Sequence, residues 1–424
     1  MIFTPFAQQK DFLRDKNRIR GAFAGKRGGK TEIGAIDAVV HTEQQLGFKP
    51  NGVDPYVGII LAPTHAMLKR LSLMKFDAYA APFRPRPVGT DRYWSNGSII
   101  YGISADKPQR AEGIKANWVW MDEGFQMKEQ IFLEAQARVA DTQGKIWVTG
   151  SLGVQYNNPK AHWIYKHFKK NPDPDTACFE WSTADNPYFP RDEIERLRSK
   201  LDPVTFRQMF ELCWDVQGTN LVFQDFTEAN IITNYQYNPR LQTFVSLDWG
   251  WNHPMSALYF QYDQPKDTVY LFDEIHGSKL TLEVLWEKMK AKPYRVTEHF
   301  CDIAGLQTRE QTALSNIQWF KNAPRSIHFR YRTAAVAHTI AIMRSYICNM
   351  KGQRRFYVDQ NACPRFVDEM RNYSYKERNG EITEETNQVA EDAISAARYF
   401  FVNKLDFTKQ TDTFTEMNRW KLGG

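Results

Sequence analysis

Residues 23–32 read FAGKRGGKTE and combine three glycines, three cations and a threonine in one turn. A short apolar run precedes this turn, and the residues after it carry apolar side chains at helical spacing. A strand, a glycine-rich loop and a helix in this order are the setting in which backbone N–H groups cradle phosphate oxygens. We therefore predict a phosphate-binding loop made of Gly25, Lys26, Arg27, Gly28, Gly29, Lys30 and Thr31. A basic surface turn is the alternative, because the pattern G-x-x-x-x-G-K-[ST] would place its first glycine at Ala24.

Residues 116–124 read ANWVWMDEG, which predicts an apolar strand that ends in two acids. In an ATPase, Lys30 would reach the β- and γ-phosphates, and the Thr31 hydroxyl would ligate Mg²⁺. Asp122 would hold the Mg²⁺ through water, and Glu123 would polarise the attacking water. A basic turn or a solvated acidic turn is common on its own, but the two motifs in this order predict ATP hydrolysis.

Two further apolar segments, YVGIILAPTHAMLK and KIWVTGSLG, each begin as a buried strand. Strands that alternate with helices predict a mostly parallel sheet with nucleotide at the C-terminal ends of its strands. The second segment ends in small polar residues that we expect to sense hydrolysis and transmit it. These residues are Thr149, Gly150 and Ser151. Arg138 lies just before this strand and is a candidate arginine finger for a neighbouring subunit, or else a plain surface ion-pair partner.

Acidic residues end two predicted strands in the second half of the chain and begin its last helix. QTFVSLDWGWNHP places Asp248 near a strand end, and the two strands after it predict an antiparallel meander. RVTEHFCDIAG is a fourth strand that ends at Asp302, and the final helical segment carries Asp392 early on one face. Phosphodiester hydrolysis needs an activated water and a stabilised leaving oxygen, which two divalent ions about 4 Å apart supply. We predict that Asp248 bridges two ions while Asp302 and Asp392 each complete one side; solvated acids are the alternative.

Composition agrees with this organisation but does not choose a function. A chain of 424 residues with 42% hydrophobic content predicts a globular protein of two or three domains. The net charge of +6 is compatible with a polyanionic partner and does not identify one. Five scattered cysteines without a C-x-x-C pair argue against a zinc knuckle and a disulfide framework. No apolar run approaches the length of a membrane span, and we expect a reducing cytoplasm.

The ordered set AGKRGGKT, LAPTHAM, QRAEGIKANWVWMDEG, VTGS and TADNPYFP resembles the large terminase subunit of tailed bacteriophages over nearly the whole chain. The resemblance implies an α/β fold with a P-loop (ASCE/RecA-like) ATPase domain at residues 1–182. A helical linker subdomain, broken at Asp202-Pro203, would follow at 183–230. An RNase H-like nuclease domain with a mobile C-terminal tail would occupy 231–424. The implied function is ATP-driven translocation of double-stranded DNA into the procapsid and metal-dependent endonucleolytic cleavage of concatemeric DNA.

The resemblance also implies roles that the spacing of residues does not supply. Gln9, with Gln8 as the alternative, matches the family's adenine-reading glutamine. Lys26 or Arg27 matches a loop cation that acts on the γ-phosphate. Glu274 in LFDEIHG matches a family glutamate and is either a further metal ligand or a solvated strand acid.

The third nuclease acid departs from one common family pattern. Many relatives carry D-A-x-R-Y in the last helix, whereas this chain reads S-A-A-R-Y, with Ser395 where the aspartate would stand. Other relatives carry an acidic pair in a pattern that EDAISA matches. We select Asp392, with Glu391 as the alternative, because position 392 lies nearly one helical turn before 395.

The implied cofactors are ATP with Mg²⁺ at the first site and two Mg²⁺ or Mn²⁺ ions at the second. The implied partners are double-stranded DNA, the portal protein and the small terminase subunit, with a homo-oligomeric ring on the portal and a monomer in solution. The implied location is the host cytoplasm, transiently at the procapsid portal and outside the mature virion. Two alternatives are a helicase–nuclease of repair or defence, which needs a second RecA-like domain, and a non-cleaving assembly factor on the same scaffold.

Overall fold

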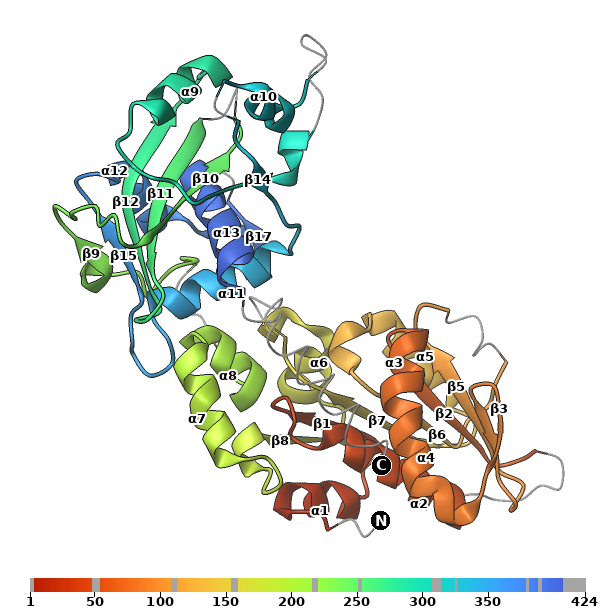
Figure 1. Cartoon of the computed structure of the whole chain (residues 1–424). Coiled ribbons are helices and arrows are strands. Elements are labelled where there is room, and N and C mark those ends of the chain that lie inside the picture. Colours follow the sequence, from red (N-terminus) through yellow and green to blue (C-terminus); the bar gives the residue numbers. More distant parts are fainter. Residues whose placement is uncertain are drawn as a thin grey trace, which may run out of the picture. The chain divides into compact units, whose positions relative to one another are not determined.

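The computed structural model describes residues 4–47, 54–107, 113–153, 159–215, 220–250, 254–306, 314–324, 326–378, 381–387 and 391–406. The chain divides into two compact units (Figure 1). The first contains Met1–Ile194 and Phe206–Val216, and the second contains Glu195–Thr205 and Gln217–Gly424. The predicted C-terminal tail beyond residue 406 lies outside the described residues, as do parts of the QRAEG and WNHP segments.

Among the described residues, the first unit contains an eight-stranded sheet in the order β3-β4-β5-β2-β6-β7-β1-β8. Its strands are β1 (Ile19–Ala24), β2 (Val57–Ala62), β3 (Arg86–Val88), β4 (Asp91–Tyr93), β5 (Ile99–Ser104), β6 (Trp118–Met121), β7 (Lys145–Gly150) and β8 (Thr176–Trp181). β4 pairs antiparallel with β3 and β5, and all the other neighbours pair in parallel. β1 and β2 are buried along their full length, as strands covered on both faces are. The predicted mostly parallel sheet is confirmed.

Helices cover both faces of this sheet. They are α1 (Ala7–Arg14), α2 (Lys30–Gln44), α3 (His65–Met67), α4 (Met74–Ala80), α5 (Glu129–Arg138) and α6 (Trp163–Tyr165), with a π-helical segment η1 (Leu68–Leu73) between α3 and α4. One face packs Phe12 of α1 and Ile33 of α2 against Ile60. The other face packs Phe132 of α5 against Ile59. Successive residues of β2 therefore face opposite layers, and the sheet is the middle layer of three.

In the described part of the second unit, a seven-stranded sheet runs in the order β14-β13-β10-β11-β12-β15-β9. Its strands are β9 (Ile231–Ile232), β10 (Gln242–Asp248), β11 (Met255–Asp263), β12 (Thr268–Gly277), β13 (Glu298–Cys301), β14 (Phe329–Arg330) and β15 (Phe356–Asp359). β10, β11 and β12 form the predicted antiparallel meander. β13 pairs in parallel with β10, and β15 pairs in parallel with β12. A separate antiparallel ribbon joins β16 (Tyr375–Arg378) to β17 (Glu381–Thr386).

Helices also pack on both faces of the second sheet. They are α9 (Leu282–Lys290), α10 (Asn316–Asn322), α11 (Val336–Ile347), α12 (Pro364–Asn372) and α13 (Asp392–Lys404). α13 lies against the meander: the ring of Phe400 stacks on Phe260 with centroids 4.1 Å apart, and Ser246 Oγ donates a 2.6 Å hydrogen bond to the carbonyl of Ala396. Leu285 of α9 packs on the opposite face. The last helix therefore lies beside the strand that carries Asp248.

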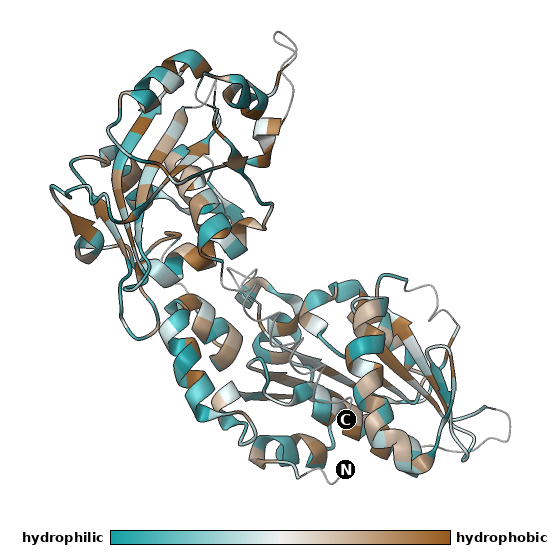
Figure 2. Ribbon diagram, in the orientation of Figure 1, coloured by the Kyte–Doolittle hydropathy of each residue, from teal (hydrophilic) through white to brown (hydrophobic). Residues whose placement is uncertain are grey.

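Two helices, α7 (Arg191–Lys200) and α8 (Pro203–Glu211), lie where the chain passes between the units. The predicted break between them is confirmed, because Asp202 Oδ1 accepts the backbone N–H of Thr205 and Pro203 begins α8. α7 is mostly hydrophilic (Figure 2). Two of the three divisions between the units fall inside α7 and α8, and the separate linker subdomain at 183–230 stays a prediction.

Neither a membrane span nor a disulfide contributes to the described fold. None of the helices in the described part of the chain has the length and apolarity needed to cross a membrane. All five cysteines are free thiols. Both sheets therefore depend on apolar packing and backbone hydrogen bonds.

Candidate functional sites

The glycine-rich loop runs from the end of β1 to the first residue of α2, as the sequence predicts. Gly29 has φ +78° at the N-terminal cap of α2, a left-handed conformation that glycine adopts without steric cost. A Cβ at Gly25 would lie 2.3 Å from the Phe210 carbonyl oxygen, so only glycine fits at that close approach. Lys26 and Arg27 are exposed on the loop, whereas Lys30 is buried. The loop therefore presents two cations and a helix N-terminus, as phosphate binding requires.

Side chains far along the chain hold the outside of this loop. Thr183 Oγ1 donates a 2.6 Å hydrogen bond to the Lys26 carbonyl, and Asn186 Nδ2 donates a 2.7 Å bond to the Arg27 carbonyl. Trp181 Nε1 donates to the Gly28 carbonyl over 2.7 Å. The backbone N–H of Lys26 in turn donates to the Met209 carbonyl over 2.6 Å. Thr183 and Asn186 both lie in the TADNPYFP segment, but their bonds to the loop were not among the predictions from sequence.

Asp122 follows the C-terminal end of β6 and is the point at which the predicted ATPase residues converge. Its Oδ1 accepts hydrogen bonds from the hydroxyls of Thr31 at 3.2 Å and Thr149 at 2.8 Å. Its Oδ2 accepts from Ser72 Oγ over 2.8 Å, and Ser72 lies in η1. Burial, followed by the charge of Glu123, raises the pKa of Asp122 to about 6. A buried acid beside the loop threonine is the arrangement expected for a Mg²⁺–nucleotide site.

The residues around Asp122 connect the acid to neighbouring strands. Glu123 has φ +57°, a left-handed conformation that is strained for a residue with a side chain. Thr149 Oγ1 also accepts a 2.9 Å hydrogen bond from Trp120 Nε1, which fixes the threonine. Ser151 Oγ donates a 2.7 Å bond to the carbonyl of Ala24, the residue before the loop. The segment predicted to sense hydrolysis thus contacts both the acid and the end of the strand that leads into the loop.

Gln9 contacts the phosphate-binding loop directly. The side chain is buried, and Nε2 donates a 3.1 Å hydrogen bond to the Gly29 carbonyl while Oε1 accepts from the Phe6 N–H. Gln8, the alternative weighed from sequence, is half-buried on the same helix. The helix that carries Gln9 therefore touches the loop on the side where α2 begins.

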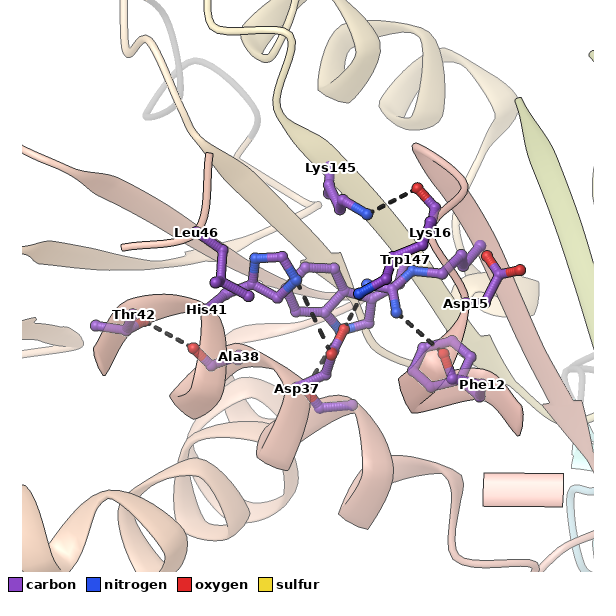
Figure 3. Close-up of polar contacts among 12 residues, drawn as sticks. Phe12, Asp15, Lys16, Asp37, Ala38, His41, Thr42, Leu46, Lys145 and Trp147 are labelled. Carbon is purple, nitrogen blue, oxygen red and sulfur yellow. Dashed lines mark hydrogen bonds and ion pairs between the residues drawn. The ribbon is translucent and has the colours of Figure 1, made fainter. Parts of the chain in front are cut away.

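A buried ion pair attaches this helix to the rest of the unit (Figure 3). Arg20 Nη2 lies 2.6 Å from Asp37 Oδ2, with the two side chains 1% and 5% exposed. Arg20 Nη1 donates to the carbonyl of Phe12 in α1 over 3.1 Å. His41 stacks on Trp147, and burial lowers the pKa of His41 to about 4, so the imidazole is neutral at pH 7. These residues join α1, β1 and α2.

Arg138 lies away from this cluster. It is the last residue of α5, and its carbonyl accepts the backbone N–H of Ala116, which precedes β6, whereas Asp122 follows β6. The half-buried side chain lines a small cavity with Ile59 and Val119. Its Nε has no hydrogen-bond partner within the described part of the chain. Arg138 therefore does not reach the nucleotide site of its own chain, which a finger acting on a neighbouring subunit does not need to do.

The three predicted nuclease acids come from three elements that pack together. Asp248 is the last residue of β10, and Asp302 directly follows β13, where the paired residues Leu247 and Cys301 set the register. Asp392 is the first residue of α13, which packs on β10. Burial, and then the negative charges of Asp392 and Asp302, raise the pKa of Asp248 to about 8. The structure therefore brings the three carboxylates within electrostatic reach of one another at Asp248.

Two further residues of α13 act on Asp248. The Tyr399 hydroxyl donates a hydrogen bond to the Asp248 carboxylate, and the charge of Arg398 partly offsets the raised pKa. Arg398 Nη2 donates a 2.7 Å hydrogen bond to the hydroxyl of buried Ser395. Ser395 thus holds Arg398. Arg398 and Tyr399 were not among the predictions from sequence, although the spacing 392, 395 and 399 places residues on one helical face.

Glu391 and Glu274, the two acids whose roles the sequence left open, have specific hydrogen-bond partners. Glu391 Oε2 accepts a 3.0 Å hydrogen bond from the Tyr373 hydroxyl, whereas Asp392 acts on the pKa of Asp248. Glu274 Oε1 accepts the N–H of Arg365 at 2.9 Å, and Oε2 accepts the N–H of Phe366 at 3.1 Å. Both oxygens of Glu274 therefore bind the start of α12, and these contacts account for its burial without a metal ion.

The donor set around Asp248 fits divalent metal. Three half-buried carboxylates near one another carry excess negative charge, which contributes to the raised pKa of Asp248, and a divalent cation would neutralise it. Within the described ranges, no group of three or more His, Cys, Asp or Glu side chains is arranged closely enough to hold a metal ion by itself.

Two domain families match the sequence. The model described as terminase large subunit, T4likevirus-type, N-terminal, matches residues 22–229, and the terminase RNaseH-like domain matches residues 245–404. Together the two matches cover most of the chain, in the order that terminase large subunits have. No curated protein is similar enough in sequence to count as a relative.

Solved structures of the large terminase from a thermophilic bacteriophage are similar to this chain. Crystal form 2 of that protein has 15% identity and a TM-score of 0.61, covering 95% of this chain and 100% of that chain. Its complex with ADP has 15% identity and a TM-score of 0.60 with the same coverage. Its complex with ATP-γ-S has 16% identity, a TM-score of 0.59 and coverage of 94% and 98%. The predicted fold class, an ATPase domain followed by an RNase H-like domain, is confirmed.

Proposed function

Because the chain belongs to the terminase large-subunit family, we propose that it is the motor and the nuclease of phage DNA packaging. It moves double-stranded DNA into the procapsid by ATP hydrolysis and cuts concatemeric DNA with a metal-dependent endonuclease. The observation that carries this proposal is the presence of two separate acid sites in one chain. Asp122 lies beside the phosphate-binding loop, and Asp248 lies beside two further aspartates.

The first site is proposed to bind ATP with Mg²⁺. The large terminase of the thermophilic bacteriophage has been crystallised with ADP and with ATP-γ-S, and we assign the same class of ligand here. Lys30 would neutralise the β- and γ-phosphates, Thr31 and Asp122 would hold the Mg²⁺, and Glu123 would activate the attacking water. The remaining loop residues supply backbone N–H groups and two exposed cations: Gly25, Lys26, Arg27, Gly28 and Gly29.

Three groups outside the phosphate-binding loop are proposed to read or relay the state of the nucleotide. Gln9 touches the loop beside Gly29, where an adenine would meet α1. Thr149 and Ser151 connect Asp122 to the strand before the loop, so a change at the γ-phosphate would move β7. Arg138 would act on a neighbouring subunit when the chain assembles as a homo-oligomeric ring.

The second site is proposed to hold two Mg²⁺ or Mn²⁺ ions, with Asp248 shared and with Asp302 and Asp392 on either side. When bound, such ions activate a water for attack and stabilise the leaving oxygen. The chain's own residues orient the acids. Tyr399 fixes the Asp248 carboxylate by a hydrogen bond, and Arg398 offsets the negative charge that gathers there.

The partners and the location follow from the proposed function. The proposed partners are double-stranded DNA, the portal protein and the small terminase subunit. The proposed location is the host cytoplasm, transiently at the procapsid portal. A helicase–nuclease is disfavoured because the second described sheet is an RNase H-like meander and not a second RecA-like sheet. A non-cleaving assembly factor remains the second candidate, because Ser395 stands where many relatives carry aspartate.

A crossed pair of variants tests the two activities. Lys30→Ala should abolish DNA-stimulated ATP hydrolysis and leave plasmid nicking in Mg²⁺ or Mn²⁺ intact. Asp248→Ala should abolish nicking and leave the ATPase intact. Loss of both activities in each variant would overturn two separate sites, and an unmodified chain that hydrolyses ATP but never nicks DNA would support the assembly factor.

A further inference from the structure

A buried acid on α12, Glu369, binds the N-terminus of α13, the helix that carries Asp392. Glu369 is 1% exposed, and its Oε2 accepts the backbone N–H groups of Ala393 at 2.9 Å and Ile394 at 3.2 Å. The first amides of a helix have no partner within the helix, and a cap residue normally satisfies them. The residue at the N-cap position, Glu391, makes no side-chain cap bond. Glu369 therefore caps α13 from a different helix.

The remaining oxygen of Glu369 fixes its direction. Arg365, one turn earlier on α12, donates from Nε to Oε1 of Glu369 over 3.1 Å. Burial raises the pKa of Glu369 to about 7, and the amides of α13 and the charge of Arg365 oppose that rise. Burying a carboxylate is unfavourable unless its hydrogen bonds are satisfied. The hydrogen bonds of Glu369 therefore hold the start of α13 against α12.

The N-terminus of α12 is likewise capped by a carboxylate from another element. Glu274, on β12 of the central sheet, accepts the N–H groups of Arg365 and Phe366, the second and third residues of α12. The N-cap position of α12 is Cys363, whose side chain makes no cap bond. A carboxylate of the sheet thus caps α12, and a carboxylate of α12 caps α13. Asp392 is the first residue of α13, so its position depends on where that helix begins.

We propose that Glu274 and Glu369 are positioning residues for Asp392. Glu274 fixes the start of α12 on the central sheet, and Glu369 fixes the start of α13 on α12, so that together they set the position of Asp392. We call this pair of caps the relay. The inference deepens the proposed nuclease function and rests on it. A helix end without a cap frays, and a shift of about 1 Å in a catalytic group can lower a rate by about a hundredfold. Outer groups that orient metal ligands typically change metal affinity by about 10- to 100-fold when they are removed. Glu274 accordingly acts through α12 and is not itself a ligand.

Glu369→Gln tests the relay because it keeps the volume of the side chain but removes the charge that faces two amides. The control is Asp368→Asn, which neutralises the neighbouring, largely exposed acid of the same helix. Mn²⁺ binding by titration calorimetry and the Mn²⁺ concentration for half-maximal plasmid nicking are measured on the full chain. We expect Glu369→Gln to weaken both by at least about tenfold, with nicking restored at saturating Mn²⁺. Asp368→Asn and the ATPase should be unchanged.

Glu274→Gln keeps the test decisive if Glu369→Gln does not fold, and it should shift both quantities in the same direction by a smaller factor. The relay is overturned if the folded variants bind Mn²⁺ and nick DNA like the parent while Asp392→Asn does not. It is also overturned if nicking is lost and does not return at saturating Mn²⁺, which would indicate a general loss of structure. If the parent neither binds Mn²⁺ nor nicks DNA, the nuclease proposal itself fails, and the relay fails with it.

Discussion

The hydroxyl of Thr149, at the end of β7, donates a 2.8 Å hydrogen bond to Oδ1 of Asp122, at the end of β6. The two residues are neighbours because β6 and β7 pair in parallel and end at the same edge of the sheet. The threonine oxygen also accepts from the Trp120 indole. One side chain therefore joins the acid of the proposed Mg²⁺ site to the strand proposed to relay hydrolysis.

Replacing Thr149 by Val tests this connection with little change in shape. The variant removes a donor from a buried carboxylate and leaves the Trp120 N–H without its acceptor. Hydrogen bonds to charged groups contribute about 1.5–3 kcal/mol, which corresponds to about tenfold or more in rate. We expect DNA-stimulated ATP turnover to fall at least about tenfold while plasmid nicking is unchanged. An unaltered turnover would mean that Thr149 does not support Asp122 during hydrolysis.

Ser72 offers a second test of the same acid from a different element. Ser72→Ala removes the donor to Oδ2 of Asp122, and we expect a several-fold loss of Mg²⁺-dependent ATP turnover by the same physical reasoning. Ser199→Ala is the matched control, because that serine lies on α7 and its hydroxyl bonds only the carbonyl of Arg196 among its described contacts. Equal effects of the two substitutions would argue against a role for η1 at the nucleotide site.

The buried pair of Arg20 and Asp37 should contribute to the stability of the first unit and not to chemistry. Asp37→Asn leaves the Arg20 guanidinium buried without its counter-ion, which typically destabilises a protein by about 3–5 kcal/mol. Urea unfolding followed by the fluorescence of the buried tryptophans around Trp147 reports the change. The double variant Arg20→Met/Asp37→Leu should recover much of the stability. Equal stability of Asp37→Asn and the parent would contradict the ion pair.

Tyr399→Phe isolates the hydrogen bond to Asp248. The substitution removes one hydroxyl and keeps the ring, so we expect plasmid nicking to slow by about tenfold with the ATPase unchanged. Tyr357→Phe is a suitable control, since the Tyr357 hydroxyl donates to the Arg354 carbonyl and not to an acid. If both variants nick DNA at the parental rate, Tyr399 does not orient Asp248.

Sequence reasoning succeeded where a signal is local. The strand–loop–helix around Lys30 and the acid-tipped strand before Asp122 are each continuous in the sequence, and their periodicity identifies the elements. The meander after Asp248 follows from short strands at short intervals. These elements then bring Thr31 to Asp122 because parallel strands end at one sheet edge.

Sequence reasoning failed where a contact joins distant segments without a pattern. Thr183 is separated from Lys26 by 157 positions, and nothing in either segment indicates that they bond. Glu369 looks like one acid of an amphipathic, charged helix, yet it is buried against α13. Glu274 matched a family glutamate, but a match in sequence does not say that both of its oxygens cap a helix.

The hydrogen bonds that hold the outside of the phosphate-binding loop have a mechanical consequence. Thr183 and Asn186 bond the loop just ahead of α7, where the chain leaves the first unit, and Met209 bonds it in α8, where the chain has returned. The chain ahead of α7 and the chain in α8 are thus both hydrogen-bonded to the same few peptide groups that are proposed to bind a triphosphate. Because one loop binds both segments, a change in its backbone on loss of phosphate would act on the chain ahead of α7 and on α8 at the same time.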